Sequence, residues 1–106
     1  MTFVEQCLQG MADPSQIDDF IDQWHEGPSQ QSLHDYLGFT AKEYACWVEE
    51  PLALRAIFFA RKTHTALEEC LEWVLADNVA ARAKILEEAE AEVLRNWLER
   101  TGRIPR

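Results

Sequence analysis

Apolar residues recur at helical spacing along almost the whole chain, and this periodicity restricts the fold more than any other feature. Ile17, Phe20, Ile21 and Trp24 occupy positions i, i+3, i+4 and i+7, the pattern of an amphipathic helix. Strand signals are missing, because the chain has no Asn-Gly or Asp-Gly hairpin turn and no sustained apolar-polar alternation. The sequence therefore predicts an all-α fold, a compact bundle of about five to seven helices.

Glycine, proline and capping residues divide this periodic sequence into helices. We expect helices over residues 3–11, from Asp13 or Ser15 to Gly27, and over 32–37, 40–50 and 52–62. One or two longer helices should cover 66–76 and 79–100, interrupted at Asp77-Asn78, with Asn78 as a cap. The residues expected to face inward, besides those of 17–24, are Phe3, Cys7, Leu8, Leu33, Tyr36, Leu37, Tyr44, Trp47, Val48, Leu54, Ile57, Phe58, Val79, Ile85 or Leu86, Val93, Leu94, Trp97 and Leu98.

The length of 106 residues predicts a single helical domain, with a helix-turn-helix-like core over 15–62 and a C-terminal helical extension over 63–106. No apolar run approaches the roughly 18 residues that span a bilayer. The first ten residues lack the basic and apolar regions of a signal peptide. A cytoplasmic location is therefore expected.

The formal net charge of −9 is concentrated in the first half of the chain. Residues 1–50 hold ten acidic residues and one basic residue, Lys42, whereas residues 51–106 hold nine of each. Such a surface repels phosphate and attracts basic protein surfaces. The alternative reading is that the charge serves solubility alone.

Residues 32–51 have the outline of a helix-turn-helix. Gly38 closes one short helix, and Thr40 with Glu43 fits a capping box that opens the next. The pattern Leu33-x-x-Tyr-Leu-Gly38-Phe-Thr-x-x-x-Tyr44-x-x-Trp-Val-Glu49 is similar to the central part of lambda-repressor-like (Xre-type) domains. The stretch LHDYLGFTAKEYACWVEEP further resembles small bacterial and phage antitoxin-like proteins, and the likeness covers about residues 15–62.

This resemblance implies a helical module that holds a toxin or a regulatory protein, sometimes also binding its own operator. Thr40, Ala41, Lys42 and Ala45 would occupy the start of the recognition helix that faces the groove. They include no Arg, Gln or Asn, the residues that read base edges. Lys42 alone cannot supply several phosphate contacts, so DNA is not expected as a partner.

The residues that carry enzyme or metal chemistry do not converge in this sequence. His25, His34 and His64 lie far apart, and the chain has no Cys-x-x-Cys, His-x-x-x-His or EF-hand spacing. A phosphate-binding glycine loop is also missing. Cys7, Cys46 and Cys70 are odd in number and sit among apolar neighbours, which favours buried reduced thiols. We therefore predict no enzymatic activity, no metal site and no cofactor.

The leading hypothesis is a non-enzymatic protein-binding module, an antitoxin or comparable inhibitor, whose acidic N-terminal half docks on the basic surface of a toxin or nucleic-acid-binding protein. The candidate contacts are acidic residues plus three aromatic anchors: Asp18, Asp19, Asp22, Trp24, Glu26, Asp35, Tyr36, Tyr44, Glu49 and Glu50. One alternative is a DNA-binding regulator that would use Thr40, Lys42, Arg55, Arg61 and Lys62. Another is a phage-type inhibitor whose spaced carboxylates mimic DNA phosphates. The C-terminal helices either complete the core of a monomer or form the seam of a homodimer, and the number of apolar stripes favours the homodimer.

Overall fold

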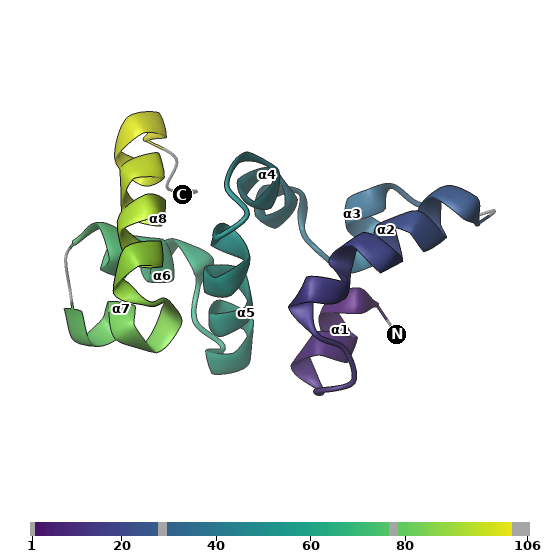
Figure 1. Ribbon diagram of the computed structural model, residues 1–106, viewed down its shortest axis with the longest axis horizontal. Coiled ribbons are helices and arrows are strands. Elements are labelled where there is room, and N and C mark those ends of the chain that lie inside the picture. The colour runs from purple at the N-terminus through teal and green to yellow at the C-terminus, as the bar shows by residue number, and fades with distance from the viewer. Residues whose placement is uncertain (1, 28–29, 77–78, 103–106) are drawn as a thin grey trace. The chain divides into compact units, whose positions relative to one another are not determined.

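The computed structural model describes residues 2–27, 30–76 and 79–102 (Figure 1). For Val79 and Ala81 it describes the backbone alone. The all-α prediction is confirmed: the described residues form eight α-helices and one 3-10 turn, and no strand. The elements are α1 (Phe3–Leu8), η1 (Pro14–Gln16), α2 (Ile17–Glu26), α3 (Leu33–Leu37), α4 (Ala41–Glu49), α5 (Ala53–Thr63), α6 (Leu67–Leu75), α7 (Val79–Ile85) and α8 (Glu88–Thr101).

The helix starts follow local capping chemistry. The predicted box that opens α4 is present, because the Glu43 amide donates to Thr40 Oγ1 (3.1 Å) and the Thr40 amide donates to Glu43 Oε1 (2.9 Å). Asp13 accepts from the Ser15 amide at 2.9 Å and caps η1, which leads into α2. Gly38 ends α3 in the left-handed conformation at φ 96°, as its position predicts.

The predicted 79–100 segment forms two helices rather than one. Glu87 caps α8, and its amide donates to Glu90 Oε1 at 3.3 Å in a further capping box. The chain therefore breaks between α7 and α8 at a capping box in which Glu87, in place of the usual Ser or Thr, is the N-cap and Glu90 is the N3 residue. The predicted break and cap at Asp77-Asn78 lie outside the described residues.

The chain divides into two compact units, Met1–Tyr44 (the N-unit) and Ala45–Arg106 (the C-unit). This boundary falls inside α4, and therefore inside the predicted 15–62 core. It differs from the predicted division at residue 63. The description of 1–106 as one domain stays a prediction.

The N-unit has a small core made by short helices. Phe3, Val4, Ile17, Leu37 and Phe39 are its buried apolar side chains. Helix α3 packs on α1 and on α2. The Phe3 ring meets the Phe20 ring of α2 with centroids 4.8 Å apart. The Phe3–Phe20 ring pair thus links α1 to α2, and α3 packs on both helices.

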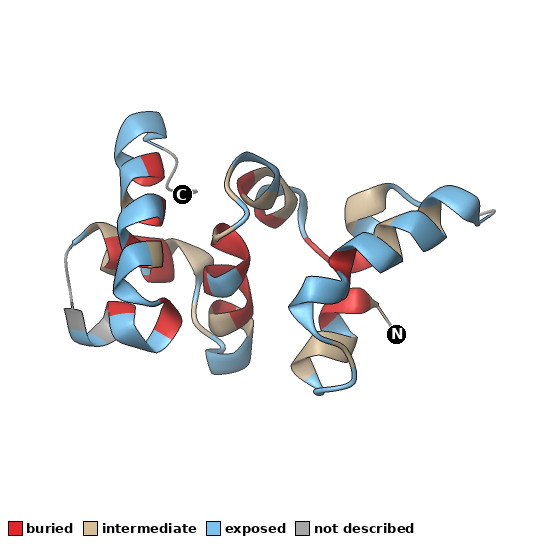
Figure 2. Cartoon of the chain, viewed as in Figure 1, coloured by how far each residue is buried: buried red, intermediate tan, exposed pale blue. Residues whose placement is uncertain are grey.

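The C-unit has the larger core, built where α6 packs against α5 and α8. Leu71, Val74, Leu94 and Leu98 are completely buried there, and Trp97 is 3% exposed. Buried residues lie along one side of α8, while its other side is exposed (Figure 2). This one-sided burial is the behaviour expected of an amphipathic helix at a protein surface.

Among the described side chains, two of those predicted to face inward are exposed instead. Val48 is 57% exposed, because Glu43 and Cys46, the buried residues of α4, lie toward the opposite side of that helix. Val93 is 48% exposed, because α8 buries the side formed by Ala91, Leu94 and Leu98. At about 100° of rotation per residue, Val93 falls beyond the edge of that side. The two predictions were wrong for different reasons: on α4 the buried side is rotated away from the predicted stripe, and on α8 it is narrower than the predicted stripe.

The three cysteines are not disulfide-bonded, as predicted, but only two of them are buried. Cys46 and Cys70 are 1% and 0% exposed, whereas Cys7 is partly exposed near the end of α1. Burial, together with the charge of neighbouring Glu69, raises the pKa of the Cys70 thiol. The prediction of a buried thiol was therefore wrong for Cys7.

We expect iodoacetamide to modify Cys7 in the folded protein, and to modify Cys46 and Cys70 only when denaturant is added. The thiolate is the reactive form, and it needs access to the reagent, which burial denies to Cys46 and Cys70. Mass spectrometry of the tryptic peptides after a short labelling pulse measures the three rates. Labelling of Cys70 as fast as Cys7 in buffer would contradict the position of α6 in the core.

Among the helices that the structure describes, none is long and apolar enough to cross a membrane.

Candidate functional site

Helix α2 presents a row of carboxylates to solvent. Asp18, Asp22 and Glu26 are spaced four residues apart and so lie on one side of the helix, with Asp19 beside them. All four side chains are exposed. Within 2–27, 30–76 and 79–102, none of the four makes an ion pair or a side-chain hydrogen bond. We call these four residues the α2 acidic face.

The N-unit has little positive charge of its own to offset the α2 acidic face. Its sequence contains eight acidic residues and one basic residue, Lys42, which is exposed. Like charges four apart weaken an isolated helix by a few tenths of a kcal/mol per pair. The opposite side of α2, where Ile17 is buried and Phe20 is half-buried, must therefore hold the helix in place.

The predicted anchor Trp24 is half-buried and has a structural task. Its indole Nε1 donates a hydrogen bond to the carbonyl oxygen of Gln31 at 2.9 Å, which ties the end of α2 to the approach to α3. Its ring meets His25 edge-on, with centroids 4.9 Å apart. The indole nitrogen is thus engaged. At about 100° of rotation per residue, Trp24 shares a side of α2 with Ile17 and Phe20 and lies away from the α2 acidic face.

The tyrosines and Asp35 lie around α3 and the start of α4. Tyr36 and Tyr44 are both half-buried, and the Tyr44 ring is 5.9 Å from that of His34. Asp35 is exposed, and its Oδ1 lies 3.4 Å from Nε2 of His34. The nearby imidazole can offset part of the Asp35 charge when it is protonated.

The structure separates the predicted partner-binding residues into two groups. Four of them share α2 as the acidic face, with Trp24 on the same helix. Asp35, Tyr36 and Tyr44 also belong to the N-unit. Glu49, which is exposed, and Glu50, which is half-buried, belong to the C-unit. Among the predicted carboxylates in the described chain, the four of the α2 acidic face lie together on one side of a single helix.

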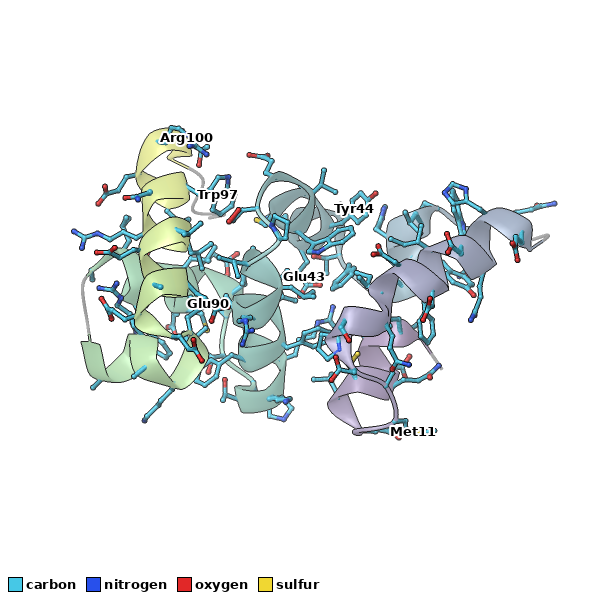
Figure 3. The ribbon with its side chains drawn as sticks, viewed as in Figure 1. Met11, Glu43, Tyr44, Glu90, Trp97 and Arg100 are labelled. Atoms are coloured by element: carbon cyan, nitrogen blue, oxygen red, sulfur yellow. The ribbon has the colours of Figure 1, made fainter. Side chains whose placement is uncertain are left out.

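The predicted DNA-contacting residues are divided in the same way. Thr40, Ala41 and Lys42 are exposed at the start of α4, and Ala45 is half-buried. Glu43 is 8% exposed and serves the capping box (Figure 3). The other cations belong to the C-unit, where Arg55 pairs with Glu90 at 3.2 Å. Arg61 is half-buried and Lys62 is exposed at the end of α5.

Two other N-unit carboxylates are occupied by helix capping. Hydrogen bonds from the backbone and side chain of Thr2 lower the pKa of Glu5, and those from the side chain and backbone of Ser15 lower the pKa of Asp13. Because folding lowers both pKa values, their stabilisation is present at neutral pH. It is lost as the pH falls through the folded values. These acids therefore support the fold.

The sequence interpretation missed a buried cation. Arg82 in α7 is 2% exposed, and its guanidinium donates to Glu88 Oε1 at 3.3 Å across the break before α8. The sequence did contain a signal for this burial. Arg82 lies three residues before Ile85 and four before Leu86, both of which are buried, and residues so spaced lie on the same side of a helix. The aliphatic stem of arginine can fill such a position.

We expect Glu88→Gln to lower the free energy of unfolding by about 1 kcal/mol, because the buried Arg82 guanidinium loses a charged partner. In an Arg82→Met background the same change should have almost no effect, since the apolar side chain needs no carboxylate. Urea unfolding of the four proteins measures the coupling. Glu92→Gln, on an exposed position of α8, is the control. Equal losses in both backgrounds would show that the pair is not coupled.

A shallow groove of about 370 Å³ in the C-unit lies where α5, α7 and the start of α8 meet. Its lining residues are Arg55, Ala83, Lys84, Ile85, Leu86, Glu87 and Glu88. Two cations and two carboxylates therefore face it, and Glu90 already pairs with Arg55. The groove has no net charge that would select a ligand.

Across the described residues, no group of three or more His, Cys, Asp or Glu side chains is placed to hold a metal ion. Comparison of the chain with protein-family models, with curated proteins and with solved structures gives no match.

Proposed function

We propose that this protein is a non-enzymatic binding module, an antitoxin or comparable inhibitor, that docks the α2 acidic face on a basic surface of a protein partner. The observation that supports the proposal is the set of four exposed carboxylates on one helix, Asp18, Asp19, Asp22 and Glu26, with no cation beside them in the described chain. Repulsion among them is relieved when a cationic surface covers the helix.

The geometry of α2 suits a partner with regularly spaced lysines or arginines. With a rise of 1.5 Å per residue, Asp18, Asp22 and Glu26 follow one another at roughly 6 Å and extend over roughly 12 Å. A second helix with basic residues four positions apart has the same spacing. We therefore propose a basic helix, or a basic surface of similar length, as the contacting element of the partner.

Charge alone does not provide high affinity. An exposed ion pair is worth about 0–1 kcal/mol, and the main gain from a charged surface is faster encounter. Trp24, which is half-buried on the apolar side of α2 and not among the carboxylates, is proposed as an additional apolar contact, because tryptophans at interfaces often contribute most of the binding energy. Tyr36 and Tyr44 are proposed as further contacts.

Of the two alternatives, one uses the same charges as the leading proposal and the other uses positive charges. A DNA-mimicking inhibitor would use the same carboxylates, and only the identity of the target separates it from the leading proposal. A DNA-binding regulator would use Arg55, Arg61 and Lys62 of the C-unit together with the start of α4, where Lys42 is the one basic residue of an N-unit that holds eight acidic residues. The charge of the N-unit therefore favours a protein partner.

The proposal predicts that a synthetic helical peptide with lysines four residues apart binds through the N-unit. The triple variant Asp18→Lys, Asp19→Lys, Asp22→Lys should lose at least about tenfold in affinity, equivalent to about 1.4 kcal/mol. Binding of the unmodified protein should weaken between about 50 and 500 mM NaCl, since salt screens exposed charges. Fluorescence anisotropy of the labelled peptide measures both effects.

The matched control is Glu68→Lys, Glu69→Lys, Glu92→Lys, which changes the net charge by the same amount but places it on α6 and α8 of the C-unit. Circular dichroism checks that both triple variants are folded. If the control lost as much affinity as the α2 variant, binding would depend on total charge, and the assignment to α2 would be wrong. Salt-insensitive binding would contradict an electrostatic contact.

A further inference from the structure

We draw no further inference here: the strongest candidate, the shallow groove where α5, α7 and the start of α8 meet in the C-unit, carries nothing because its cations Arg55 and Lys84 are balanced by neighbouring glutamates and nothing in the structure shows what covers it.

Discussion

Leu94→Ala is expected to lower the free energy of unfolding of the C-unit by about 2–5 kcal/mol. Leu94 is completely buried on α8, in the same core as Leu71, Val74 and Leu98. Removing its isobutyl group deletes apolar contacts and leaves a cavity, because a close-packed core relaxes only in part. Urea unfolding followed by tryptophan fluorescence and by circular dichroism gives the change.

The neighbouring Val93→Ala is the matched control. Val93 is 48% exposed, so its truncation removes few buried contacts, and alanine has a higher helix propensity than valine. The expected change is within about 0.5 kcal/mol. Equal losses at the two positions would mean that α8 buries Val93 as well as Leu94. The inward position that the sequence predicts for Val93 would then be correct.

Gly38→Ala is expected to destabilise the N-unit by roughly 2–4 kcal/mol. Gly38 has φ 96°, where a side chain is strained by about 1–2 kcal/mol. An added Cβ would also lie 2.4 Å from Oγ1 and 2.8 Å from Cβ of Thr2. Thr2 Oγ1 accepts the Glu5 amide and caps α1, so displacing Thr2 removes a cap worth about 1 kcal/mol as well. Thermal unfolding monitored by circular dichroism measures the loss.

Gly10→Ala separates backbone strain from the clash. Gly10 also has a positive φ, 76°, but an added Cβ meets nothing within 4 Å. Its substitution should therefore produce the backbone strain alone. Thr2→Gly in the Gly38→Ala background should recover part of the loss, because glycine clears the space and remains a tolerated N-cap. Equal losses for Gly10→Ala and Gly38→Ala, with no recovery, would contradict the close approach of Thr2 to Gly38.

Features that depend on a few neighbouring residues could be predicted well. The Thr40–Glu43 capping box and the left-handed conformation of Gly38 are both present at the positions that the sequence predicts. The four exposed carboxylates of the α2 acidic face follow from helical spacing in the same way. Each of these outcomes depends on hydrogen bonds or spacing within one short helix or turn, and little tertiary context is needed to decide them.

Features that depend on distant packing could not be predicted. Glu43 and Arg82 are charged, yet both are buried, whereas Val48 and Val93 are apolar and exposed. The break before α8 was also missed, since a glutamate is a weaker start signal than serine or threonine. For the four misplaced side chains, the width and direction of the buried side are set by the helices packed against it.

The amino-acid order by itself determined the helical class, the positions of most helix ends and the strong negative charge of residues 1–44, because these depend on local backbone chemistry and on composition. Only the tertiary structure decided which side of each helix is covered, and with it the burial of the charged residues Glu43 and Arg82. Burial depends on contacts between helices that are far apart in sequence, and a helical stripe is compatible with several such contacts.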